Sequence, residues 1–489
     1  MTDSTDLHIE HGQPTIGDCP SGALIGSEWR TLSATFPVRS PASGNVVARV
    51  ADCGADEARA AADIAVAAFG VWRQKTAYER ATILRRWNDL ILARQDELAR
   101  IMSLEMGKPI AEARGEVRYT AGFVEFYAEE AKRVYGETIP SQFAHKRLFA
   151  IKQPVGPTYA ITPWNFPAAM ITRKAAPALA AGCSMIIKPA EQSPLSALFL
   201  GQLWLEAGGS PGTLQMLPCL DPIPVSTVLI DDPRIRKLTF TGSTAVGIKL
   251  YTQAGPTMKR LSLELGGHSP FLIFADADLD RAVKEVVASK FRNAGQTCVC
   301  TNRIYVHETI HDRFVDLLAQ AAGKLKVGDP LEETTQIGPL VDQDVFDKVR
   351  GHVADAVDKG ARVVTGGTAG ERTFFQPTVL SDVTAGMRIL EEETFGPVAP
   401  VLRFQEEAEA VRLANATPVG LAAYLWTTDL SRAFRVAEAL EFGIIGVNDG
   451  VPSTPQAPFG GVKNSGIGRE GGKWGIDEYL DVKYVSMAL

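Results

Sequence analysis

Short apolar segments alternate with longer segments at helical spacing from Val155 onward, and this alternation constrains the fold more than any other feature of the chain. The expected strands end at Ile161, span Ser184–Ile187, lie near Leu214 and span Lys237–Phe240. Helices are expected after Pro167, Pro194 and Pro222 and from Ser243. Because consecutive strand–helix units place their strands side by side and in parallel, the pattern predicts an α/β fold with a doubly wound sheet.

The rest of the chain adds three further groups of expected elements. Residues 56–70 and 77–101 have helical spacing, and the segment from Tyr135 to Gln153 has a β-like pattern broken by glycine and proline. A second α/β series is expected between Ser269 and Val447. Its strands are predicted at Phe271–Phe274, Arg303–Val306, Val363–Val364, Val398–Leu402, Ala423–Trp426 and Ile444–Val447.

Composition excludes several classes of function. The 489 residues carry a formal net charge of −7 and no basic run, which argues against nucleic acid as a partner. No apolar stretch has the length of a membrane span, and the N-terminal residues 1–14 lack the order of a signal peptide. Six scattered cysteines do not resemble a disulfide framework. We therefore expect a cytoplasmic protein with reduced thiols and no membrane partner.

Two strand ends are candidates for binding a nucleotide. In the first, an apolar strand ends at Phe240 and leads through Gly242 and Ser243 into a helix containing Gly247; in the second, Lys188 and Glu191 follow a neighbouring strand. A helix N-terminus after a glycine offers free N–H groups to a pyrophosphate, and a capped helix start is the simpler alternative. A solvated charge pair is the alternative for Lys188 and Glu191.

A glycine pattern of the dinucleotide-binding type is also present near the C-terminus, at Gly466, Gly468 and Gly471. Only 18 residues follow Gly471 in the 489-residue chain, so no helix with an acidic residue about 20 positions on can complete the fingerprint. This pattern is therefore expected not to bind a dinucleotide.

The strongest chemical signal is the segment from Phe291 to Cys300, which contains Cys298 in polar company. A thiolate can attack a carbonyl carbon and leave again from a thioester, although an isolated cysteine is more often a packing residue. None of the seven histidines lies in a motif typical of a Cys–His hydrolase. Glu264 interrupts an apolar strand before two glycines, where burial would raise its pKa toward that of a general base.

These motifs together resemble the NAD(P)-dependent aldehyde dehydrogenase superfamily over nearly the whole chain. The resemblance assigns the nucleophile to Cys298 in FRNAGQTC, the general base to Glu264 in LELGG and an oxyanion-stabilising amide to Asn165 in TPWNFP. It implies a cofactor, NAD or NADP, and no metal. The implied cofactor-binding residues are Trp164, Lys188, Glu191, Gly242, Ser243, Gly247, Glu393 and Phe395.

The C-terminal stretch from Ala457 to Leu480 is most similar to the succinate-semialdehyde dehydrogenase group of that superfamily. The resemblance implies that Arg173, Arg292 and Ser453 hold the distal carboxylate of a short aldehyde substrate. Solvated or helix-capping arginines are the alternative. Relatives that prefer NADP commonly carry a small residue where Glu191 stands, so we expect NAD to be preferred over NADP.

The resemblance also implies the domain organisation and the mechanism. It predicts a dinucleotide-binding domain (residues 1–130 and 154–263), a catalytic domain (264–460) and a β-element (131–153 and 475–489) that pairs subunits into a homodimer or homotetramer. Oxidation would proceed through a Cys298 thioester. For the substrate, the alternatives are glutarate semialdehyde or a broad range of aldehydes. For the second half of the reaction, the alternative is transfer of the acyl group to coenzyme A. A non-catalytic structural or binding protein of this fold is the alternative to an enzyme. Cys300 is a candidate for a reversible disulfide with Cys298.

Overall fold

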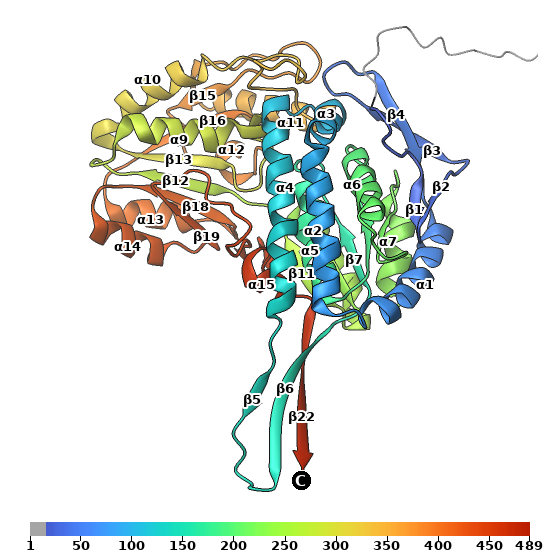
Figure 1. The fold of residues 1–489 in the computed structure, drawn as a ribbon. Coiled ribbons are helices and arrows are strands. Elements are labelled where there is room, and N and C mark those ends of the chain that lie inside the picture. Colours follow the sequence, from blue (N-terminus) through green and yellow to red (C-terminus); the bar gives the residue numbers. More distant parts are fainter. Residues whose placement is uncertain (1–15) are drawn as a thin grey trace, which may run out of the picture.

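A computed structural model describes residues 16–489, which form two α/β bodies with a narrow β-arm projecting from between them (Figure 1). The N-terminal residues 1–14, where a signal peptide was not expected, lie outside this range, as does part of the predicted segment 1–130. None of the helices in the described part is long and apolar enough to cross a membrane.

The first body contains an eight-stranded sheet with the order β2-β1-β9-β8-β7-β10-β11-β21. Its strands are β1 (Ala23–Ile25), β2 (Glu28–Arg30), β7 (Thr158–Ile161), β8 (Met185–Lys188), β9 (Leu214–Met216), β10 (Lys237–Thr241), β11 (Arg260–Glu264) and β21 (Gly466–Ile467). The five inner strands from β9 to β11 are parallel, as predicted, whereas β1 and β21 pair antiparallel at the two sides. These antiparallel strands come from distant parts of the chain and were not predicted.

The helices between residues 55 and 254 surround this sheet (Figure 1). They are α1 (Ala55–Trp72), α2 (Ala77–Ala93), α3 (Gln95–Met106), α4 (Ile110–Glu130), α5 (Ala169–Ala181), α6 (Leu195–Glu206), α7 (Pro222–Asp231) and α8 (Thr244–Ala254). The helical spacing predicted over 77–101 is confirmed, but two helices share it, because the chain leaves the helical conformation at Arg94 and α3 starts after it. Thr76 begins α2 with a reciprocal capping box to Glu79, which satisfies two otherwise free N–H groups.

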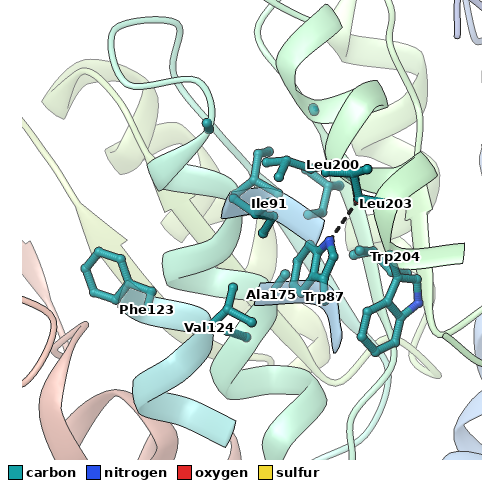
Figure 2. Close-up of a cluster of buried hydrophobic side chains, with 14 of the residues drawn as sticks. Trp87, Ile91, Phe123, Val124, Ala175, Leu200, Leu203 and Trp204 are labelled. Atoms are coloured by element: carbon teal, nitrogen blue, oxygen red, sulfur yellow. Dashed lines mark hydrogen bonds between the residues drawn. The ribbon is translucent and has the colours of Figure 1, made fainter. Parts of the chain in front are cut away.

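The core of the first body lies between α2, α4, α5 and α6 (Figure 2). Trp87 is fully buried there and donates its indole N–H to the Leu200 carbonyl at 3.1 Å. Its ring meets Trp204 edge to face, with 5.3 Å between the ring centroids. A buried indole of this kind typically stabilises a fold by about 3–5 kcal/mol, so this packing fixes the helices that carry the site residues described below.

The second body contains a seven-stranded sheet with the order β14-β15-β16-β13-β12-β18-β19. Its strands are β12 (Ser269–Ile273), β13 (Thr301–His307), β14 (Arg362–Thr365), β15 (Thr378–Ser381), β16 (Val398–Phe404), β18 (Ala422–Trp426) and β19 (Ile444–Val447). Its helices are α9 (Leu279–Phe291), α10 (His311–Ala322), α11 (Gln343–Asp358), α12 (Arg388–Glu391), α13 (Glu407–Asn415) and α14 (Leu430–Ala439). All six predicted strands are confirmed, and β15 is an additional strand.

The arm is a three-stranded antiparallel sheet made of β5 (Glu137–Ile139), β6 (Lys146–Pro154) and β22 (Leu480–Ala488). It joins the predicted β-segment to the C-terminus and extends away from both bodies (Figure 1). Val482, Tyr484 and Met487 expose apolar side chains on it. The remaining small elements are the hairpin β3 (Thr35–Arg39) and β4 (Val46–Ala51), the pair β17 (Val419–Gly420) and β20 (Val462–Lys463), and α15 (Gly472–Asp477).

Candidate active site

Three adjoining cavities run from the first sheet to the second. The largest, of about 540 Å³, and the smallest, of about 230 Å³, share a wall at Trp164, Gly242 and Ser243. The third, of about 330 Å³, shares Phe166, Met170 and Cys298 with the smallest. Cys298 therefore lies between two cavities, so a molecule in either one can reach its thiol.

The predicted nucleotide contacts line the first two cavities, apart from one. Lys188, at the carboxyl end of β8, pairs with Glu191 at 2.9 Å, and Glu191 stays partly exposed to the cavity. Gly247 lines neither cavity. A Cβ at Gly247 would lie 2.4 Å from Leu265, so this glycine lets α8 pack closely on the segment after β11.

The turn between β10 and α8 combines the two interpretations of its sequence. Ser243 is the N-cap of α8 and accepts a hydrogen bond from the Val246 N–H, as the capping interpretation predicted. Gly242 and Ser243 also line the wall shared by the two cavities, and a Cβ at Gly242 would meet the Phe240 ring at 2.4 Å. The turn therefore brings backbone N–H groups of a helix start to the cavity surface, which is the geometry that suits a pyrophosphate.

The smallest cavity has the features of a nicotinamide site. Phe395 has a left-handed φ of 54° and meets Trp164 edge to face, with 5.4 Å between centroids. Glu393 accepts a hydrogen bond from the Gly267 N–H at 3.3 Å, and burial raises the pKa of its carboxyl to about 7. Two ring walls and a carboxylate acceptor can hold a flat ring and a ribose. The residues in this part of the chain therefore fit the second half of a dinucleotide.

A strained turn precedes Cys298, the predicted nucleophile. Asn293, Ala294 and Gly295 all have positive φ, of 52°, 54° and 76°. Gly295 is required there because a Cβ would lie 2.2 Å from the Gly396 carbonyl oxygen. Burial raises the pKa of the Cys298 thiol to about 12, while the Arg173 guanidinium acts in the opposite direction. Consecutive left-handed non-glycine residues are costly and typically mark functional sites.

Asn165 lies in the loop between β7 and α5 and lines the nicotinamide-type cavity together with Cys298. Its side-chain amide donates one hydrogen bond, to the Gln296 carbonyl at 3.0 Å. A primary amide has two N–H donors, so one holds the side chain in place and the second is available to a substrate oxygen. This arrangement suits the predicted oxyanion role.

Glu264 ends β11 and is 3% exposed. Burial raises the pKa of its carboxyl well above the ordinary value, and the nearby Glu470 carboxylate adds to this increase. Glu264 does not line either cavity beside Cys298, and its Oε2 has no hydrogen-bond partner among the described residues. A buried, unpartnered carboxyl of raised pKa is suited to receive a proton from water.

The C-terminal glycines shape the surroundings of Glu264. Gly466 pairs with Glu264 across β21 and β11, and a Cβ there would lie 1.9 Å from the Leu263 carbonyl oxygen. A Cβ at Gly460 would lie 2.8 Å from the Glu264 carboxylate. Close packing on β11 therefore explains Gly466, and none of the three glycines in this pattern lines the nucleotide-type cavities.

The third cavity ends in cations. Arg173, Arg292 and Ser453 all line it, although they come from α5, the turn before Cys298 and a C-terminal loop. Arg173 is 3% exposed and donates to the Tyr119 hydroxyl at 2.6 Å, so the alternative of a solvated helix face is wrong. The Nε atoms of both arginines are buried and have no hydrogen-bond partner within residues 16–489. The Arg173 Nε forms an ion pair with the Glu470 Oε2 at 3.7 Å, so the buried Nε of Arg292, which has no hydrogen-bond partner, is the donor that favours an anionic ligand in this cavity.

Comparisons with known proteins place the chain among its relatives. Residues 29–485 match the model of the aldehyde dehydrogenase family. The chain belongs to this family. It is 55% identical over 471 residues to the NADP(+) succinate-semialdehyde dehydrogenase of Escherichia coli (96% of this chain, 98% of the relative). It is 51% identical to the glutarate-semialdehyde dehydrogenase of Pseudomonas putida (96% and 98%).

A solved structure agrees with this assignment. The crystal structure of succinate-semialdehyde dehydrogenase from Burkholderia pseudomallei has 52% identity and a TM-score of 0.95, and covers 98% of this chain and 99% of that chain. The fold is therefore the aldehyde dehydrogenase fold, and the protein is an oxidoreductase of the NAD(P)-dependent aldehyde dehydrogenase class.

Several residues of this aldehyde dehydrogenase site were missed in the sequence. The third cavity is also lined by Lys108, Glu112, Glu116, Tyr119, Phe166, Met170 and Phe459. Lys348 lies beside Glu393, with its Nζ 5.9 Å from the centroid of the Phe395 ring. Glu112 and Glu116 of α4 gave no signal, because helices usually carry such residues on a solvated face, and Lys108 lies in the short connection between α3 and α4. The one available signal was the pair of adjacent cations Arg173 and Lys174 in an otherwise apolar helix, which indicates buried charges near this site.

No metal site is evident in the described range: residues 16–489 contain no group of three or more His, Cys, Asp or Glu side chains placed to hold an ion. Metal-free chemistry remains a prediction from the family resemblance. Cys300 is buried, and its Sγ lies 3.5 Å from the Lys290 carbonyl oxygen.

Proposed function

We propose that this enzyme oxidises succinate semialdehyde to succinate with NAD as its preferred acceptor. The observation that carries the proposal is the position of Cys298 between a nicotinamide-type cavity and a cavity that ends in Arg173 and Arg292. An aldehyde with a distal carboxylate would place its carbonyl at the thiol and its charge at the guanidinium groups. Both relatives reported above are named for ω-carboxy aldehydes, which supports the same class.

Each half of the proposed reaction uses different residues. The Cys298 thiolate attacks the aldehyde carbon, and the Asn165 amide stabilises the oxyanion of the resulting thiohemiacetal. Trp164, Gly242, Ser243, Glu393 and Phe395 would hold NAD(P), which would supply the hydride acceptor. Loss of hydride from the substrate carbon leaves a thioester. Glu264 takes a proton from water, and the hydroxide attacks the thioester and expels the Cys298 thiolate, giving the acid.

The proposal is tested by initial rates with matched aldehydes. Succinate semialdehyde and glutarate semialdehyde should be oxidised with far higher kcat/KM than butanal and pentanal, because only the former supply an anion to the arginines. The cavity volume of about 330 Å³ leaves the choice between the two chain lengths to the measurement. Equal rates for charged and neutral aldehydes would favour a broad-range dehydrogenase instead. Activity that requires coenzyme A would favour an acylating enzyme. The absence of activity with every aldehyde would favour a non-catalytic binding protein.

Removing either guanidinium should separate charged from neutral substrates. We expect Arg292→Ala and Arg173→Ala to lower kcat/KM for succinate semialdehyde roughly ten- to a hundredfold, since a charge-assisted hydrogen bond contributes about 1.5–3 kcal/mol. Butanal should be affected little, because it has no carboxylate to lose. Steady-state kinetics with both aldehydes measure this, and Arg292→Lys tests whether charge without the planar fork suffices. A parallel loss for both aldehydes would show that the arginines are structural.

Cofactor preference should depend on Glu191. A carboxylate beside the adenosine ribose accepts a hydrogen bond from a 2′-hydroxyl and repels a 2′-phosphate, so NAD should be preferred. Glu191→Ser should then narrow the ratio of kcat/KM for NAD over NADP by about tenfold or more. The Escherichia coli relative is named for NADP(+), so the unmodified enzyme must be measured first. Equal use of both cofactors by that enzyme would contradict this prediction.

We propose Cys300 as a partner for Cys298 in a reversible disulfide. Peroxide should inactivate the enzyme, dithiothreitol should restore it, and Cys300→Ala should lose the restoration because no resolving thiol remains. Activity before and after each treatment measures this. Inactivation that dithiothreitol cannot reverse, or equal reversibility in Cys300→Ala, would leave Cys300 as a packing residue.

We also propose that the protein is a cytoplasmic homodimer or homotetramer. The apolar side chains exposed on the arm support its role in pairing subunits, since such residues are typical of interfaces. All six cysteines are free, which supports a reducing compartment. The division into residues 1–130 with 154–263, 264–460, and 131–153 with 475–489 remains a prediction that accompanies this proposal.

A further inference from the structure

The backbone carbonyl of Asn165 is held by two buried donors. Lys108 donates from Nζ to this oxygen at 2.9 Å, and Asn293 donates from Nδ2 at 3.0 Å. Asn165, Lys108 and Asn293 are 5%, 1% and 2% exposed. Asn293 belongs to the strained turn that precedes Cys298, so it ties the nucleophile to Asn165. Lys108 follows the left-handed Gly107 at the end of α3, so it belongs neither to the motif of Asn165 nor to that of Cys298.

Glu116 holds the other end of the same loop. Its Oε1 accepts the Ala168 and Ala169 N–H groups at 3.0 and 3.1 Å, where α5 begins. Its Oε2 pairs with the Lys108 ammonium, and both side chains are 1% exposed. The ion pair therefore joins the start of α5 to the carbonyl of Asn165, three residues earlier. The Lys108 Nζ also lies 3.8 Å from the centroid of the Phe166 ring, which lines the third cavity.

A buried ion pair is not explained by stability alone. Removing two charges from water costs several kcal/mol per ion, and well-packed apolar residues of similar volume would stabilise a fold as well or better. Apart from the bond that joins the pair, the hydrogen bonds of the Lys108 ammonium and of the Glu116 Oε1 all go to the loop that carries Asn165. A hydrogen-bond donor to a developing oxyanion must be held within about 0.5 Å, because catalysis by such a donor depends on its position before the reaction.

We propose that the Lys108–Glu116 ion pair is a positioning device for Asn165, which keeps the side-chain amide aimed at the thiohemiacetal oxyanion. The proposal rests on the oxyanion role proposed for Asn165 above. Lys108 and Glu116 also line the third cavity, but their hydrogen bonds outside the pair go to the loop from Asn165 to Ala169, and it is through this loop that they are proposed to act. Their contribution therefore falls on the step that forms charge on the aldehyde oxygen, and the binding of NAD(P) is unaffected.

A double-mutant cycle on single-turnover formation of reduced cofactor tests this. Lys108→Met should slow the first turnover about 10- to 100-fold, less than the 10²–10³-fold typical of deleting an oxyanion donor, which is expected for Asn165→Ala. Lys108→Met combined with Asn165→Ala should be no slower than Asn165→Ala alone, because Lys108 has then nothing to position. The dissociation constant for NAD(P), measured by fluorescence quenching, should stay unchanged. Multiplicative effects of the two substitutions would overturn the proposal.

Two further variants separate positioning from folding. Lys108→Met combined with Glu116→Gln leaves no unpaired charge in the core and should show the same slow first turnover and the same non-additivity with Asn165→Ala. A wild-type first-turnover rate in this double variant would overturn the proposal even if the Lys108→Met enzyme alone does not fold. Lys259→Met is the matched control: Lys259 is also buried and bonds two backbone carbonyls, of Asp232 and Ile235, but lines neither cavity beside Cys298. It should lower the melting temperature without slowing the turnover.

The same data distinguish failure of the inference from failure of the proposed role of Asn165. A wild-type first-turnover rate in Asn165→Ala would overturn the oxyanion role, and the positioning proposal with it. A slow Asn165→Ala enzyme beside a fast Lys108→Met enzyme would overturn the positioning proposal alone.

Discussion

Cys298→Ala should abolish oxidation of every aldehyde, with a loss of at least about 10⁴-fold in kcat. The reason is that the alanine methyl group offers no nucleophile, and water cannot form the thiohemiacetal from which hydride leaves. Stopped-flow measurement should show neither a burst nor a steady rate of reduced cofactor. Binding of NAD(P) should persist, because Cys298 contributes only one wall of the smallest cavity.

The control for this substitution is Cys300→Ala. Cys300 lies two residues on in the same loop and is fully buried, so its variant reports disturbance of local packing. We expect it to retain most of the activity. Comparable loss in both variants would mean that the loop, and not the Cys298 thiol, accounts for the effect, and any substantial steady rate in Cys298→Ala would contradict the assignment of the nucleophile.

Glu264→Gln should keep the first half of the reaction and stall the second. Hydride transfer needs Cys298 and Asn165, whereas hydrolysis of the thioester needs a base, and positioned general bases typically contribute 10²–10⁴-fold. A burst of reduced cofactor close to one per active site should precede a steady rate lowered about 100-fold or more. Hydroxylamine, which attacks thioesters without a base, should restore turnover. A full steady rate without added nucleophile would exclude Glu264 as the base.

The pH dependence of hydrolysis follows from the same carboxyl group. Burial and the Glu470 carboxylate raise the pKa of Glu264, and only the ionised form can accept a proton from water. Hydrolysis should therefore fall as the pH is lowered through this raised pKa, at a pH above the ordinary range of a glutamate. The decline should be absent from the residual hydrolysis rate of Glu264→Gln.

Local patterns predicted the chemistry well because they reflect constraints that neighbouring residues share. Alternation of strands and helices predicted both main sheets, and the motifs around Cys298, Glu264 and Asn165 pointed to residues that the fold brings to one region. The break at Arg94 within 77–101 was missed because it is one residue long and contains neither glycine nor proline. Strands such as β1 and β21 were missed because they pair with partners far away in the sequence.

The sequence by itself therefore determined the α/β class and predicted the reacting groups, since both depend on residue type and short spacing. Tertiary structure alone decided which charged side chains are buried around them. Lys108 stands in the short connection between α3 and α4 and Glu116 lies within α4, yet packing against α5 places both on the loop of Asn165. Arg173 likewise became a buried cation only because α4 and the C-terminal segment cover its helix. Burial of these side chains depends on long-range contacts, whereas burial of Glu264 was predictable from the apolar strand around it.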